Sequence, residues 1–146
     1  MRFWHQSLLP YLDDKRLLSQ HRECCALRGK GWGKKHSTVD YVFKYDLAHL
    51  YQYHIEVMHE MAKRKFKMHD YSWMRRTWRG ISYGDVSIAD VGTYIFFPDK
   101  DVLIYKEHDN KYIRECLLNL KAKGAELTNG ISIDEWLIKL DLEDFI

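Results

Sequence analysis

The chain has 146 residues, of which 46% are hydrophobic and 30% are charged, and its formal net charge is +2. This size and balance fit one folded domain and exclude a largely disordered chain. No apolar run approaches the roughly 18 residues of a membrane span, and the start has no signal-peptide pattern, so we expect a cytoplasmic protein without a membrane partner. The cysteine count is three, an odd number that favours a reducing compartment.

The charge is unevenly distributed along the chain. Residues 22–44 carry a net charge of +4 and residues 63–79 one of +6, whereas residues 126–146 carry −5. The two basic segments are candidates for a surface that faces nucleic-acid phosphates. The same charges also suit solvated loops and helix faces, so charge alone does not decide between the two interpretations.

The first third of the chain predicts a packed start, a helix and a loop. Residues 1–10 are apolar and aromatic, which predicts packing against the core. A helix is predicted from a cap at Asp13 or Asp14 to a stop at Gly29. Residues 28–38 are rich in glycine and lysine, which predicts a loop, and Trp32 lies in it without apolar neighbours.

The middle of the chain is less regular. A long helical region is predicted over about residues 39–66, with a break or bend near Asp46, because its apolar positions follow helical spacing. Apolar segments on either side of residues 98–101 favour either a short β-hairpin near 93–105 or connectors buried in a helical domain.

Two further helices are predicted near the C-terminus. Asp109 is expected to cap a helix that runs to Lys123 and is ended by Gly124. Ser132 and Glu135 form a capping-box pattern for a last helix, over about residues 133–140. The sequence therefore predicts a mainly α, compact fold with one domain over residues 1–146.

Three stretches form a recognisable pattern: MRFWH at the start, LLSQHRE in the first helix and the basic glycine-rich loop after it. Together they resemble the pyrimidine-dimer DNA glycosylase family, whose best-known member is a phage endonuclease V. The block QHRECCALRGKGWGKKHSTVDYVFKY is also similar to a bacterial branch of this family. The resemblance covers roughly the first half of the chain. It implies a compact helical fold like that of the phage endonuclease V, and cleavage of the N-glycosidic bond in damaged DNA followed by an abasic-site lyase step.

The resemblance also implies catalytic residues. The family's nucleophile is the α-amine of the N-terminal residue, and a glutamate on the first long helix works beside it. These roles match Met1, which is expected to be retained before the large Arg2, and Glu23. A terminal amine with a pKa of about 7.7–8.0 is neutral in a useful fraction at neutral pH, whereas a lysine near about 10.4 is not. A carboxylate beside the resulting imine can move protons during base loss and β-elimination.

The expected partner is double-stranded DNA with a damaged base or an abasic site. Arg2 and Arg22 match basic residues of the family and are expected to hold flanking phosphates. Trp32 is a candidate for stacking on a base or wedging into the duplex, with packing against the N-terminal segment as the alternative. The other candidate DNA-binding residues are His21, Arg28, Lys30, Lys34, Lys35 and His36. A core position is the alternative for His21, and a solvated loop is the alternative for His36 and the lysines.

The C-terminal tail departs from the family. The phage enzyme has an aromatic, lysine-containing segment there that helps to grip DNA, whereas DEWLIKLDLEDFI is acidic and repels phosphates. The pyrimidine dimer is the expected lesion, and two alternatives stay open. One is a lyase for a different modified base. The other is a non-catalytic nucleic-acid-binding domain on the same fold, with the basic loop as its surface.

No cofactor and no metal are expected. A site made of His5, His21 and Cys24 or Cys25 is conceivable, because i, i+3 spacing puts His21 and Cys24 on one helix face. No pattern such as CxxC supports it, and both cysteines suit small core positions. The histidines of the second helical region are five residues apart, which spreads them around a helix and argues against ligand roles (His49, His54 and His59). Nothing in the sequence predicts the oligomeric state.

Overall fold

The computed structural model of the protein describes residues 2–28, 40–45, 47–67, 77–78, 81–82 and 103–143. The elements are the 3₁₀ helix η1 (Gln6–Tyr11), α1 (Asp14–Arg28), the 3₁₀ helix η2 (Asp40–Lys44), α2 (Leu47–Lys63), the strands β1 (Thr77–Trp78) and β2 (Ile81–Ser82), α4 (Asn110–Ala122) and α5 (Ile133–Glu143). The fold is mainly α, as the sequence predicts.

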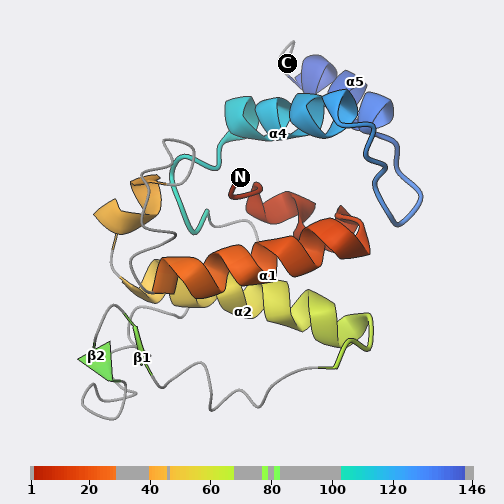
Figure 1. The fold of residues 1–146 in the computed structure, drawn as a ribbon. Helices are drawn as coiled ribbons and strands as arrows, with labels where there is room; N and C mark the ends of the chain where they lie inside the picture. Colours follow the sequence, from red (N-terminus) through yellow and green to blue (C-terminus); the bar gives the residue numbers. More distant parts are fainter. Residues whose placement is uncertain are drawn as a thin grey trace.

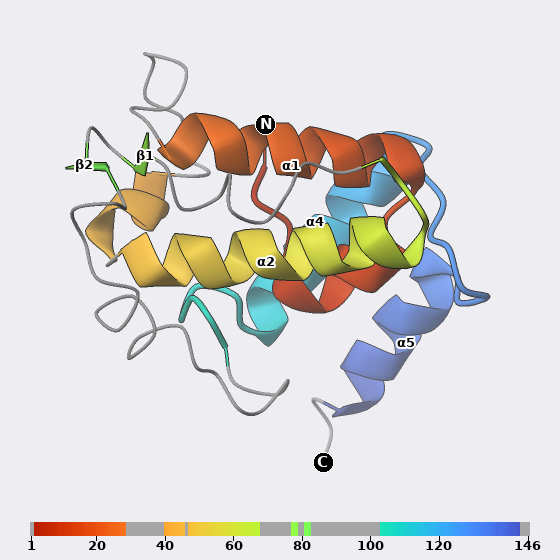
Figure 2. The same cartoon turned by 90° about the horizontal axis from the view of Figure 1, so that it is seen from below.

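The helices form two layers with the N-terminal segment between them. α1 and α2 run antiparallel and side by side, and they make the most extensive helix–helix contact. α4 lies on the other side of the N-terminal segment and packs against α5 (Figure 1). Helices therefore lie on both sides of η1 and of the residues before it, as Figure 2 also shows. This burial explains why the chain opens with apolar and aromatic residues.

The pairing of α1 and α2 follows from helical periodicity. Leu17, Cys24 and Leu27 recur on one face of α1 and are at most 1% exposed. Leu50 and Val57 of α2 are likewise completely buried. Burying a leucine side chain contributes about 1.5–3 kcal/mol, so a few such positions suffice to fix the pair.

The predicted helix ends are confirmed where the structure describes them. Asp109 caps α4, since its Oδ1 accepts a hydrogen bond from the Tyr112 N–H at 2.9 Å. Gly124 follows α4 with a φ of +71°, the left-handed conformation that ends many helices. Ser132 Oγ accepts from the Glu135 N–H at 3.0 Å at the start of α5. α5 continues to Glu143, three residues beyond the prediction.

Arg64, just after α2, joins that helix to the start of α1. Its guanidinium donates to Glu60 and Asp14 at 3.0 Å each and to the carbonyl of Pro10 at 3.2 Å. The Arg64 side chain is only 15% exposed, so this network is partly shielded from solvent. The end of α2, the start of α1 and η1 are thereby held at one corner of the molecule.

The middle of the chain confirms one prediction and leaves another undecided. The helical region predicted over 39–66 is indeed in two pieces, because η2 ends at Lys44 and α2 begins at Leu47. β1 and β2 pair antiparallel, with Thr77 opposite Ser82. Of the hairpin near 93–105, residues 93–102 lie outside the described residues, and 103–105 are not in a strand. Among the described helices, none combines the length and apolar character needed to cross a membrane.

Candidate functional site

Glu23 lies on the inner side of α1. It is 3% exposed, although it is a charged residue. The buried stripe of α1 runs through Leu17, Gln20, Cys24 and Leu27, and Glu23 lies one turn after Gln20. Side chains three residues apart on a helix are neighbours, about 5–6 Å between Cβ atoms. The helix therefore places Glu23 next to Gln20 among its buried side chains.

Gln20 binds the N-terminal segment directly. Its side-chain Oε1 accepts from the Trp4 N–H at 2.7 Å, and its Nε2 donates to the Arg2 carbonyl at 3.4 Å. Gln20 is 2% exposed, so water does not compete for these bonds. The backbone from Arg2 to Trp4 is thereby fixed one helical turn before Glu23. A glutamine within a largely apolar stripe is the sequence signal for this role.

Two tyrosines from other helices fix the same segment. Tyr53 of α2 donates its hydroxyl to the Trp4 carbonyl at 2.5 Å and approaches Gln20 Oε1 at 3.1 Å. Tyr112 of α4 donates to the Phe3 carbonyl at 2.5 Å. Burial raises the pKa of both tyrosines, so both remain protonated donors at neutral pH. Neither tyrosine has a sequence signal, because these partners lie 33 or more residues away.

The side chains of the segment are held as firmly as its backbone. The Phe3 ring stacks on Tyr53 with centroids 3.9 Å apart and is completely buried. Arg2 extends toward α4, where its guanidinium carbon lies 5.8 Å from the Tyr112 ring centroid. Arg2, which is predicted to hold a DNA phosphate, therefore contacts Tyr112 of α4 in this structure.

His5 continues this packed segment and ends in a buried histidine pair. Its ring stacks on His108, with centroids 5.5 Å apart, and its Nδ1 accepts from the Ser7 N–H at 3.0 Å. Burial lowers the pKa of His5 to about 4. Burial and, to a smaller degree, the nearby His5 ring lower the pKa of His108 to about 3. His108 Nε2 also shares a 2.5 Å hydrogen bond with the Tyr41 hydroxyl. Both imidazoles are neutral at physiological pH and act as parts of the core.

The remaining predicted residues divide into three groups. Arg22 is exposed on α1, where it is free to meet a phosphate, and His21 is half-buried beside His54 of α2. Cys24 is a buried core residue, as predicted. Arg28 ends α1, and only its backbone is described. The remainder lie outside the described residues: Met1, Lys30, Trp32, Lys34, Lys35 and His36.

The arrangement has a clear chemical character. A carboxylate stands in a water-poor layer of the fold, and the backbone of residues 2–4 is locked beside its helix by three polar side chains from α1, α2 and α4. Electrostatic and proton-transfer effects of a carboxylate are stronger in such a layer than in water. The site therefore places a buried acidic side chain on the helix that holds the backbone of residues 2–4.

Comparison with known proteins identifies the family. The sequence profile described as pyrimidine dimer DNA glycosylase matches residues 1–74, just over half of the chain. The chain therefore belongs to the pyrimidine dimer DNA glycosylase family. The family is one of DNA repair glycosylases, so it implies a DNA substrate. No curated protein and no solved structure matches the chain, so the likeness to the phage endonuclease V fold remains a prediction.

Proposed function

We propose that the protein is a DNA glycosylase with abasic-site lyase activity, that its substrate is a pyrimidine dimer in duplex DNA, and that the Met1 amine and Glu23 are its catalytic groups. The family membership supports the glycosylase class. One structural observation carries the mechanism: buried Gln20 binds the backbone of Arg2 and Trp4 one helical turn before buried Glu23. A nucleophile on the first residue needs such an anchored chain start.

The chemistry begins with the neutral Met1 amine. Its lone pair attacks C1′ of the damaged nucleotide, the N-glycosidic bond breaks, and the base leaves with the bonding electrons and takes up a proton. Opening of the sugar ring gives an iminium ion at C1′. Glu23 supports the cationic sugar electrostatically, accepts the proton that is lost from the attacking nitrogen and passes it to the ring oxygen O4′ as the C1′–O4′ bond breaks, so that it is ionised again for the lyase step.

The lyase step uses the same two groups. The iminium draws electrons from C2′, so a base removes a C2′ proton and the C3′–oxygen bond breaks, with the 3′ phosphate leaving as the anion. Glu23, the buried carboxylate beside the chain start, is the proposed base. Water then hydrolyses the imine and frees the amine. Arg22, exposed on the same helix, is the proposed phosphate contact that holds the strand during both steps.

The experiment compares Glu23→Gln with the parent protein. The substrates are duplexes that carry a cyclobutane pyrimidine dimer or an abasic site, and both binding and strand cleavage are measured. We expect Glu23→Gln to bind both duplexes within about threefold of the parent and to lose at least about 100-fold in cleavage rate, in the range of general acid–base contributions. Glu115→Gln, a change at an exposed position of α4, is the matched control and should cleave normally.

Each alternative function gives a different result. Normal strand cleavage by Glu23→Gln removes that residue from the mechanism. Binding of both duplexes by the parent with no cleavage of either favours the non-catalytic nucleic-acid-binding domain. Cleavage of the abasic duplex alone favours a lyase for a different modified base.

A further inference from the structure

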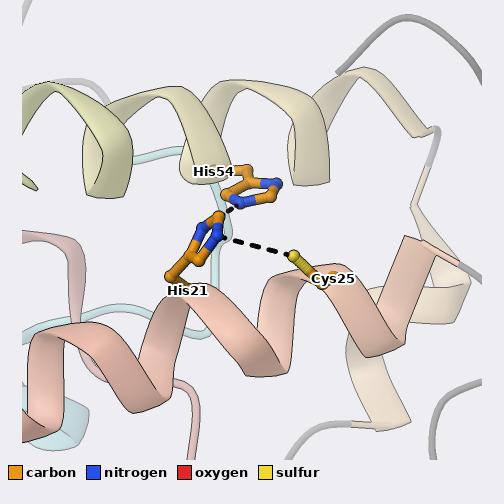
Figure 3. Close-up of side chains that lie close together, drawn as sticks. All are labelled: His21, Cys25 and His54. Carbon is orange, nitrogen blue, oxygen red and sulfur yellow. Dashed lines mark hydrogen bonds between the residues drawn. The ribbon is translucent and has the colours of Figure 1, made fainter. Parts of the chain in front are cut away.

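Three potential metal ligands meet across the seam between α1 and α2. His21 and Cys25 come from α1 and His54 from α2, and their side chains point toward one another (Figure 3). His21 Nδ1 lies 2.8 Å from His54 Nε2, and His21 Nε2 lies 3.8 Å from Cys25 Sγ. One nitrogen or sulfur atom from each residue can be chosen so that all three lie within 4.8 Å of one another.

We propose that His21, Cys25 and His54 form a zinc site that joins α1 to α2. Two imidazole nitrogens and a thiolate are the donor set that a borderline-soft divalent ion prefers, and zinc accepts it without a demanding geometry. Three protein ligands leave the fourth tetrahedral position to a water molecule. The sequence predicts no metal, and the metal site considered and set aside there combined His5, His21 and Cys24 or Cys25. His5 and Cys24 belong to other parts of the core, and His54 is the residue that completes the group.

The distances require moderate side-chain movements. Zinc bonds of about 2.0–2.1 Å to nitrogen and about 2.3 Å to sulfur place tetrahedral ligand atoms about 3.3–3.6 Å apart. His21 offers Nδ1 to His54 and Nε2 to Cys25, and only one of these nitrogens can bind the ion, so the relevant limit is that three single ligand atoms lie within 4.8 Å of one another. These atoms must approach by up to about 1.5 Å. Side-chain rotation of His21 and Cys25, which are half-buried, supplies this movement. Completely buried His54 is the fixed ligand.

The proton balance is simple. The Cys25 thiol loses its proton to solvent when the sulfur binds zinc. The proton that now lies between the two imidazoles moves to the other nitrogen of its own ring, so that each ring offers a lone pair. Binding therefore releases one proton, and the affinity rises with pH.

The site is separate from the proposed catalytic group. Glu23 is two residues from both His21 and Cys25 on α1, a rotation of about 200° around a helix of 3.6 residues per turn. The zinc ion would thus bind on the α2 side of the helix, while Glu23 lies on the opposite side. A bound zinc ion would cross-link α1 to α2. A test of this site needs neither DNA nor catalytic activity.

The test is a cobalt titration of the untagged, full-length, reduced protein after treatment with a chelator. Cobalt replaces zinc in such sites and reports a thiolate ligand through a sulfur-to-cobalt charge-transfer band. We expect one equivalent of cobalt to give this band and zinc to remove it. Cys25→Ala should abolish the band and weaken zinc binding by more than about 100-fold, because a lost ligand costs more than a lost outer contact. The neighbouring Cys24→Ala is the matched control and should keep the band.

A second readout guards against variants that misfold. Zinc should raise the melting temperature of the parent protein and of Cys24→Ala, and should leave that of Cys25→Ala unchanged. His21→Asn, a change at a half-buried position, should behave like Cys25→Ala. The proposal is overturned if the folded parent gives no charge-transfer band, or if Cys25→Ala keeps the band and the zinc-dependent shift.

Discussion

Replacement of Gln20 by alanine tests how the chain start is held. The substitution removes the acceptor of the Trp4 N–H and the donor to the Arg2 carbonyl, and it withdraws a contact of the Tyr53 hydroxyl. The Trp4 N–H then remains in a layer where Trp4 is 6% exposed and Gln20 2% exposed. A buried donor left without its acceptor costs about 1–3 kcal/mol, and the small cavity adds to this. We expect a loss of about 2–4 kcal/mol in the free energy of unfolding.

The effect on catalysis should exceed the effect on folding. If residues 2–4 are no longer fixed on α1, the amine before them loses its position, and a displacement of about 1 Å costs on the order of 100-fold in rate. Urea unfolding followed by tryptophan fluorescence gives the stability, and single-turnover cleavage of an abasic duplex well below the melting temperature gives the rate. Gln52→Ala, which removes a contact to exposed Glu56, is the matched control. A stability loss below about 0.5 kcal/mol, or a rate equal to that of the parent, would refute the reasoning.

Three further predictions concern stability and binding. Burial lowers the pKa of His5 to about 4 and that of His108 to about 3. Below a pH of about 6.5, these two histidines therefore bind protons in the unfolded chain but not in the folded chain, so the folded state loses stability. Urea unfolding at pH 7 and pH 5 should show a loss of about 2 kcal/mol per ring, and equal stability at both values would contradict it. Arg64→Met should lower the free energy of unfolding by about 2 kcal/mol, because it breaks the hydrogen-bond network at the end of α2, and Arg64→Lys should lose less. Thermal unfolding of the parent and both variants measures this, and identical melting temperatures would count against the network. Arg22→Ala should weaken duplex binding and lower the salt slope of log K by about 1, whereas Lys111→Ala on α4 should leave both unchanged; an unaltered salt slope for Arg22→Ala excludes the phosphate contact.

The sequence predicts the helices well because their signals are local. Asp109, Gly124 and Ser132 act within one helical turn of themselves, and the structure has each of them in its predicted role. The break between η2 and α2 agrees with the break or bend that the sequence predicts near Asp46. Glu23 comes from the family resemblance, and the helix that carries it follows from periodicity.

The contacts that build the site depend instead on distant residues. Gln20 meets Trp4, 16 residues earlier, and Tyr53, 33 residues later. His54 meets His21 across the same helix pair, at a separation of 33 residues. A spacing rule within one helix relates His21 to Cys24 but cannot relate it to His54. Only the antiparallel docking of α1 and α2 brings these side chains together.

The most direct test of the proposed mechanism is borohydride trapping of the imine. Protein with a native Met1 terminus is mixed with a labelled duplex that contains an abasic site or a cyclobutane dimer, reduced, and digested so that the adduct is mapped by mass spectrometry. A chain with two residues added before Met1 is the control for the position of the amine. We expect a covalent adduct on the Met1 nitrogen, formed at least about 100-fold more slowly by the extended chain. No adduct from protein with a free N-terminus, or an adduct on a lysine side chain, would contradict the account.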